Sequence, residues 1–150
     1  MITLSTIVCP TDFSKAASRA VDYGAAMADS FGAKLVLLHV IPELNYPLRS
    51  FGMASSFPQL LKELHERARD SLQKRSDEVH ATFAGLQIEL ELRDGDAHEG
   101  VLEAAKAHQA DMIVMGTHGH TGLKHALLGS TAEKVVRMAA CPVLTVRTQD

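Results

Sequence analysis

The chain alternates between short apolar runs rich in β-branched residues and longer stretches whose apolar side chains have helical spacing. The short runs have the length of strands, and the longer stretches are typical of amphipathic helices. This alternation predicts a parallel sheet, because parallel neighbours need a crossover connection, which is usually a helix. The expected strands are Ser5–Pro10, Lys34–Val40, Gln87–Arg93, Met112–Met115 and Pro142–Arg147.

Helix ends are marked by residues suited to capping. A helix that begins near Ser14 is expected to end at Gly32, since glycine tolerates the left-handed conformation common at a helix carboxyl end. Asp96 and Ser130 are each followed three residues later by Glu, the pattern of a capping box, and predict two more helix starts. A fourth helix is expected over Pro58–Phe83. The elements therefore alternate along the whole chain.

These elements predict an α/β fold: a doubly wound five-stranded parallel sheet with helices on both faces. The third expected strand alternates apolar residues with Glu89, Glu91 and Arg93, as at a sheet edge that is wetted on one face. With right-handed crossovers, the strand order 3-2-1-4-5 places this strand at one edge. Ligands of such sheets bind beyond the carboxyl ends of the strands where the order reverses. We therefore expect a site between the first and fourth strands.

The composition limits the classes of function. The chain has 150 residues and no linker or internal repeat, so we expect a single domain over residues 1–150. A formal net charge of -3 gives no basic field for nucleic acid, and no apolar run approaches the roughly 20 residues that span a bilayer. Cys9 and Cys141 are predicted at opposite ends of the sheet, too far apart to bridge. Two unpaired cysteines favour a reducing cytoplasm.

The segment GTHGHTGLKHALLGST, residues 116–131, follows the fourth strand and carries the chemistry of the predicted site. It contains four glycines, three histidines and one lysine, and no acidic residue. Glycines allow backbone N–H groups to approach an anion, and the helix expected at Ser130 adds the positive end of its dipole. The segment therefore predicts a phosphate-binding loop.

This loop matches neither of the common phosphate motifs. The chain has no Gly-Lys pair for a P-loop, and no GxGxxG follows the first strand. A glycine-rich turn without a ligand is the simpler alternative, although four glycines and a capped helix exceed what a turn needs. The spacing His118-x-His120 suggests zinc, but neither cysteine is near in sequence to complete a set of ligands.

The glycine spacing also resembles a family motif. Gly116-x-x-Gly119, nine residues, then Gly129-Ser130 is similar to the ATP-binding motif of the universal stress protein family. The segments IVCPTDFS, LLHV and CPVLTVR resemble that family too, so the likeness covers essentially the whole chain. It implies a small α/β domain, usually a homodimer, that binds ATP with Mg²⁺ and serves stress-related regulation. The glycine motif implies the ATP-binding subgroup.

The resemblance implies a role for each matching residue. Thr11 and Asp12 would approach the ribose and adenine, and Val40 would flank the base. A simple helix cap at Asp12 and an ordinary core valine at Val40 are the alternatives. The remaining residues would meet the phosphates or adjoin them. The expected cofactor-binding residues are Pro10, Thr11, Asp12, Val40, Met115, Gly116, His118, Gly119, Gly129, Ser130 and Thr131.

Other histidines and the longest connection have structural interpretations. His39 lies in an apolar strand and is expected to be a hydrogen-bonded structural residue. The histidines in the predicted helices are expected to be solvated: His65, His80, His98 and His108. The connection Ile41–Phe57 is unusually apolar for a loop, and it either folds back beside the nucleotide or offers a partner surface.

Three functions compete. The first is an ATP-binding regulatory module, the second a slow ATPase or an adenylyl-transferring enzyme, and the third a dimeric interaction protein that uses no nucleotide. The glycine loop disfavours the third, and the lack of a phosphate-loop lysine predicts negligible or slow turnover. A homodimer is expected through the fifth strand, Pro142–Arg147, because this edge carries no charge before Arg147.

Overall fold

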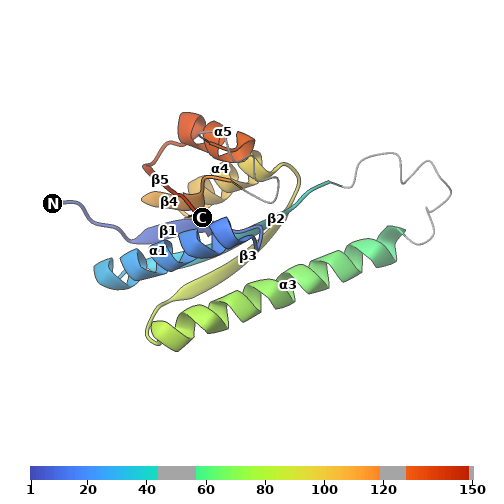
Figure 1. Ribbon diagram of the computed structural model, residues 1–150, viewed down its shortest axis with the longest axis horizontal. Coiled ribbons are helices and arrows are strands. Elements are labelled where there is room, and N and C mark those ends of the chain that lie inside the picture. Colours follow the sequence, from blue (N-terminus) through green and yellow to red (C-terminus); the bar gives the residue numbers. More distant parts are fainter. Residues whose placement is uncertain (44–56, 119–127, 149–150) are drawn as a thin grey trace.

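The computed structural model describes residues 1–43, 57–118 and 128–148. Within these residues the strands form one parallel sheet in the order β3-β2-β1-β4-β5, which confirms the predicted topology (Figure 1). The strands are β1 (Thr6–Pro10), β2 (Lys34–Ile41), β3 (Ile88–Asp94), β4 (Met112–Gly116) and β5 (Val143–Val146). The helices are α1 (Lys15–Phe31), α3 (Phe57–Thr82), α4 (Ala97–Ala107) and α5 (Ser130–Met138).

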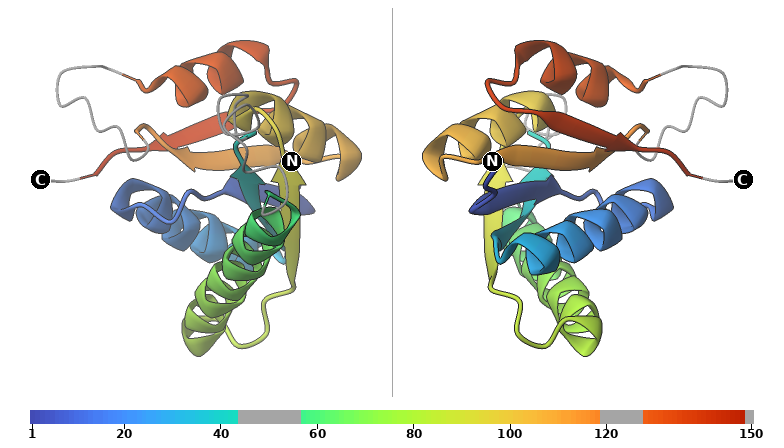
Figure 2. Two further views of the ribbon diagram at one scale, coloured as in Figure 1. Left: turned by 90° about the vertical axis from the view of Figure 1, so that its right-hand side faces the viewer. Right: turned by 90° about the vertical axis from the view of Figure 1, so that its left-hand side faces the viewer.

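Among the described elements, two helices cover each face of the sheet. Figure 2 shows α4 and α5 on one side of the strands and α1 and α3 on the other. The first core contains Ile7 of β1 with Val21 of α1 and Leu72 of α3. The second contains Val8, the next residue of β1, with Val101 of α4. Adjacent residues of β1 thus serve opposite cores, as the twofold alternation of a strand requires. The predicted coverage of both faces is confirmed.

Local capping signals position α1 and α4. The Ser14 side chain accepts a hydrogen bond from the Ala17 N–H, and Gly32 ends α1 with a left-handed φ of 67°. Asp96 accepts hydrogen bonds from the N–H groups of Glu99 and His98, which together hold the pKa of its carboxyl below the usual range. Both helix starts therefore follow the predicted capping residues.

The predicted capping box at Ser130 is wrong. Helix α5 begins at Ser130 itself, with Gly129 as its N-cap, and no side chain caps it among the residues that the structure describes. The cause is a long-range contact, because the N–H of Gly129 donates to the carbonyl oxygen of Thr117 at 2.6 Å. This bond fixes Gly129 beside the end of β4 and starts the helix one residue earlier than a cap at Ser130 would.

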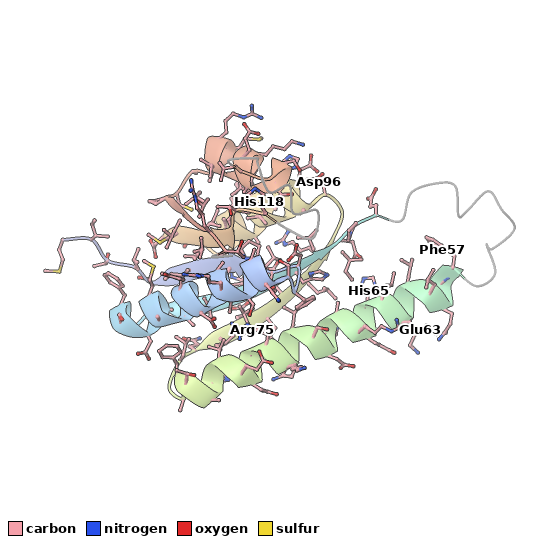
Figure 3. The ribbon with its side chains drawn as sticks, in the orientation of Figure 1. Phe57, Glu63, His65, Arg75, Asp96 and His118 are labelled. Atoms are coloured by element: carbon pink, nitrogen blue, oxygen red, sulfur yellow. The ribbon has the colours of Figure 1, made fainter. Side chains whose placement is uncertain are left out.

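Helix α3 is anchored to α1 by Arg75, which lies between the two helices in Figure 3. Its guanidinium donates to the Ser18 carbonyl oxygen at 3.0 Å and forms an ion pair with Asp22. The buried residues of α3 begin at Ala68, and the part of the helix before it reaches past the sheet (Figure 1). In the described part of the chain, no helix combines the length and apolarity that a bilayer crossing requires.

The two edges of the sheet differ in charge. At the β3 edge, Lys34 pairs with Glu89 at 2.8 Å, and Arg93 bridges Glu91 and Glu103. This confirms β3 as an edge protected by charged side chains. The opposite edge is β5, whose described strand VLTV contains no charged residue. Most of the connection from Ile41 to Phe57 lies outside the described residues.

Candidate functional site

A cavity of about 320 Å³ lies at the carboxyl ends of β1, β2 and β4. This is the point where the strand order reverses between β1 and β4, so a cavity lies where the sequence predicts a binding site. Every predicted site residue that the structure describes lines the cavity, and Gly119 lies outside the described residues. The lining residues are Pro10, Thr11, Asp12, Ala17, His39, Val40, Ala97, Val101, Met115, Gly116, Thr117, His118, Gly129, Ser130, Thr131 and Ala132.

The turn after β1 brings Thr11 and Asp12 to the cavity. The Thr11 hydroxyl accepts a hydrogen bond from the Phe13 N–H at 3.0 Å, and the Asp12 carboxylate accepts one from the Ser14 N–H at 3.0 Å. Phe13 adopts a left-handed φ of 64°, which is uncommon for a bulky residue. The turn is therefore held tightly. Asp12 braces the start of α1 and also lines the cavity, so the two interpretations of this residue are compatible.

His39 joins this turn to the end of β2. Its Nδ1 lies 2.7 Å from the Thr11 carbonyl oxygen, and its ring centroid lies 4.7 Å from that of Phe13. The expectation of a hydrogen-bonded structural histidine is confirmed. The residue also lines the cavity, which sequence reasoning missed. Its position depends on the contact between the end of β2 and the turn after β1, which the sequence does not reveal.

The end of β4 and the start of α5 form the opposite wall. The N–H of Thr117 donates to the Val146 carbonyl oxygen at 3.1 Å, and the Thr117 carbonyl oxygen accepts a hydrogen bond from the Gly129 N–H. A Cβ atom at Gly129 would lie 3.0 Å from that oxygen, and one at Gly116 would lie 3.0 Å from the backbone of Ala16. Both glycines therefore permit close approach between backbone segments. These contacts bring the two ends of the glycine-rich segment together.

The amino end of α5 supplies hydrogen-bond donors to this wall. The first N–H groups of a helix have no partner within the helix, and the helix dipole makes this end partly positive. Ser130 and Thr131 line the cavity, and none of the described side chains caps the helix. Asp12 provides the sole carboxylate among the described lining residues. This wall is therefore suited to an anion.

The wall beside β2 is apolar. Val40 lies near the end of β2 and packs against the core formed with α4, while Ala97 and Val101 of α4 line the same part of the cavity. Val40 thus has both the core contacts and the cavity position that its two interpretations require. The capping signal at Asp96 located the start of α4, but its packing over β2 could not be read from the sequence. Sequence reasoning missed both α4 residues for that reason.

The prediction of solvated helix histidines is wrong, because each forms a hydrogen bond or ion pair. Hydrogen bonds to the Leu61 carbonyl oxygen and to Asp94 raise the pKa of His65. Two of the partners, Asp94 and Glu91, lie on strand β3, and local sequence does not reveal their contact with the helices. The pairs are His65–Asp94, His80–Leu86, His98–Asp96 and His108–Glu91. His120 lies outside the described residues.

The two cysteines are not bonded to each other. Cys9 is fully buried near the carboxyl end of β1, and burial raises its pKa to about 12. Cys141 precedes β5 and is partly exposed. The rejection of a disulfide between them is confirmed.

The comparisons with known proteins agree over nearly the full chain. The sequence model of the universal stress protein family matches residues 3–147. Universal stress protein MJ0531 of Methanocaldococcus jannaschii is 35% identical over 144 residues, which cover 94% of this chain and 81% of the relative. The solved structure of MJ0577 has a TM-score of 0.84 and 31% identity and covers 99% of each chain. A solved universal stress protein in complex with cAMP has a TM-score of 0.69 and 28% identity over 99% of this chain and 100% of its own.

Proposed function

The chain belongs to the universal stress protein family, and we propose that it is an ATP-binding regulatory protein that acts in stress responses as a nucleotide-dependent homodimer. The observation that carries this proposal is the start of α5 at the cavity wall, which no side chain of the described residues caps. Helix amino ends with free-standing N–H groups are established phosphate-binding positions. The glycine-rich segment that leads into this helix supports a ligand with several phosphates.

The remaining walls support an adenine nucleotide. The apolar wall of Val40, Ala97 and Val101 suits the face of a base, and Asp12 can accept a hydrogen bond from a ribose hydroxyl. A relative with the same fold is in complex with cAMP, which also contains adenine and ribose. The cavity volume falls within the range of small-molecule sites. ATP would place its phosphates at the start of α5, its ribose at Asp12 and its base against the apolar wall.

Magnesium would accompany the ATP through its phosphates. Mg²⁺ in nucleotide sites is usually held by phosphate oxygens and water with one or two carboxylates. Asp12 is assigned to the ribose, and the other described lining residues supply no carboxylate. The site therefore fits a nucleotide-borne Mg²⁺ better than a resident metal.

Binding, rather than rapid hydrolysis, is the proposed activity. Phosphoryl transfer usually uses a lysine or arginine to stabilise charge on the transferred group. The described cavity lining contains neither. We expect turnover to be negligible or slow, and a steady-state rate above about 1 s⁻¹ would make the protein an ATPase. The two unpaired thiols favour the cytoplasm as its compartment.

The dimer is proposed to form through the open edge of β5. Ile113 donates to the Pro142 carbonyl oxygen and Thr117 to that of Val146, so these backbone groups face β4. Alternate residues of a strand direct their backbone groups to opposite sides, which leaves Val143 and Thr145 facing the open edge. Val136 and Met138 of α5 are exposed large apolar residues. Antiparallel pairing with a second copy would close this edge.

Two experiments test the proposal. In the first, acid releases the small molecule that freshly purified protein carries. Chromatography and mass spectrometry should identify this molecule as an adenine nucleotide. Calorimetry of nucleotide-free protein should show micromolar ATP binding, about -8 kcal/mol. Failure of ATP, ADP, AMP and cAMP to bind would refute the function.

The dimer is tested with a matched pair of variants. Thr145→Pro removes an outward N–H, whereas Thr145→Val retains it. Light scattering should give twice the 16.2 kDa chain mass for the wild type and Thr145→Val, and the single-chain mass for Thr145→Pro. A wild-type protein that stays at the single-chain mass at high concentration would rule the dimer out.

A further inference from the structure

We infer that Gly100 of α4 sets the width of the base end of the cavity by fixing the position of Val40, and thereby favours a purine over a pyrimidine base. This inference rests on the proposed nucleotide-binding function and adds a residue that does not itself line the cavity. It makes Gly100 a positioning residue that acts through Val40.

The sheet order separates the two ends of the cavity. Strands β2 and β4 lie on either side of β1, so they are about 10 Å apart at two strand spacings. The anion-binding wall lies beyond β4, where Gly116 meets the start of α5. A nucleotide with its phosphates at that wall therefore extends its base over β1 toward Val40.

Gly100 lies directly against Val40. A Cβ atom at position 100 would be 2.7 Å from Val40 Cγ2, 3.2 Å from Cγ1 and 3.5 Å from Cβ. The first distance is shorter than real contacts between carbon atoms, so any side chain would force a displacement. Glycine is unfavourable inside a helix, and its presence at the end of the first turn of α4 is explained by this close approach.

Neither backbone is free to move apart. The β2 backbone is held by β3, where Val40 pairs with Arg93 and Ile41 with Asp94. The start of α4 is held to the same strand, because the Gly95 N–H donates to the Ile41 carbonyl oxygen at 2.9 Å and Asp96 then caps the helix. The displacement must therefore be taken up by the Val40 side chain.

The Val40 side chain can yield only by turning its methyl groups. A β-branched residue has few χ1 positions, and turning the two methyl groups away from α4 directs one toward the cavity that Val40 lines. The base end would become narrower by about one methyl group. A purine, which has two fused rings, loses more contact there than a pyrimidine does.

The test compares ATP and CTP binding to Gly100→Ala by calorimetry. One methylene in a pocket is worth roughly 10- to 200-fold, so ATP affinity should fall about tenfold or more and CTP affinity should fall less. Gly85→Ala is the matched control, since a Cβ there would meet no atom within 4 Å. It should keep both affinities and their ratio.

A second variant separates positioning from general damage to the fold. Combining Gly100→Ala with Val40→Ala removes the two Val40 methyl groups that the new Cβ would displace. The ratio of ATP affinity to CTP affinity in this double variant should equal that of Val40→Ala alone. This readout holds even if Gly100→Ala alone folds poorly. Equal losses for ATP and CTP, or no rescue, would overturn the inference. If the wild type binds no nucleotide, the proposed function fails first, and that result is distinct from unchanged binding in Gly100→Ala.

Discussion

His39 Nδ1 lies 2.7 Å from the Thr11 carbonyl oxygen, so the end of β2 is joined directly to the turn that follows β1. A carbonyl oxygen can only accept, and Nδ1 must therefore carry the hydrogen. In the neutral ring this leaves Nε2 as the acceptor. The Phe13 ring, which lies tilted against the His39 ring, adds a second contact between the strand and the turn. Two walls of the cavity are positioned by one side chain.

Replacing His39 should loosen this connection. His39→Phe keeps an aromatic ring but leaves the Thr11 carbonyl without its donor, and the free energy of unfolding should fall by about 1 kcal/mol or more. Urea denaturation measures the change. His39→Asn, whose amide nitrogen can approach the position of Nδ1, should recover part of the loss. Equal stability of the wild type and His39→Phe would show that the bond contributes nothing.

Gly116→Ala should weaken both the fold and nucleotide binding. The new Cβ would lie 3.0 Å from the Ala16 carbonyl carbon and 3.1 Å from its oxygen, and these are backbone atoms that cannot rotate away. Overpacking of this kind costs about 1–3 kcal/mol. Thermal denaturation and calorimetry with ATP check the two effects. Gly85→Ala, which meets no neighbouring atom, should match the wild type in both.

Asp12→Ala should weaken ATP, ADP and AMP by the same factor, because a ribose contact does not depend on the number of phosphates. Asp12→Asn retains an oxygen that can accept from the Ser14 N–H, so it separates the brace at α1 from the ligand contact. Calorimetry with the three nucleotides measures both variants. A loss confined to ATP would instead assign Asp12 to the metal and outer phosphates.

The His65–Asp94 pair should stabilise the protein more in mild acid than in base. Hydrogen bonds to Leu61 and Asp94 raise the pKa of His65 in the folded state above 6.5. A raised folded pKa gives stability that is complete below the unfolded pKa and is lost as the pH rises through the folded pKa. The unfolding free energy of the wild type minus that of His65→Gln should therefore be larger at about pH 5.5 than at about pH 8.5.

Two controls accompany this pH measurement. Asp94→Asn should reduce the pH dependence, and high salt should reduce it as well, because Asp94 is mostly exposed. A difference that grows toward alkaline pH would contradict the assignment.

The two thiols should differ sharply toward iodoacetamide. Burial raises the pKa of Cys9 to about 12, and the thiolate is the reactive form, whereas Cys141 is partly exposed. Mass spectrometry of the native protein should find alkylation at Cys141 alone, and denaturation in urea should add Cys9. Native Cys141→Ser should remain unlabelled. Labelling of both cysteines at one rate would show that β1 opens readily.

Much of the fold was predictable because its signals are local. The left-handed end of α1 depends on Gly32, and the edge position of β3 follows from the alternation that includes Glu89 and Glu91. The glycine spacing identified one wall of the cavity, since Gly116 and Gly129 are drawn together by a backbone hydrogen bond at Thr117.

The remaining features depend on contacts between distant segments. The start of α5 is set by the Gly129–Thr117 bond, so the apparent capping box at Ser130 was misleading. The closeness of Gly100 to Val40 depends on how α4 lies over β2, and no local pattern encodes that distance. The partners of the helix histidines, such as Asp94 for His65, were hidden for the same reason.

The unequal edges of the sheet limit how far the protein can assemble. Glu89 and Arg93 of β3 form ion pairs at that edge, Glu89 with Lys34 of β2, whereas the β5 edge has no charged residue in its described strand. Fibre growth by strand addition requires two receptive edges on each unit, so that every added copy offers a new one. A unit with a single receptive edge uses it up on first pairing. Pairing through β5 would therefore join two copies and leave no receptive edge for a third, so that assembly would stop at the dimer.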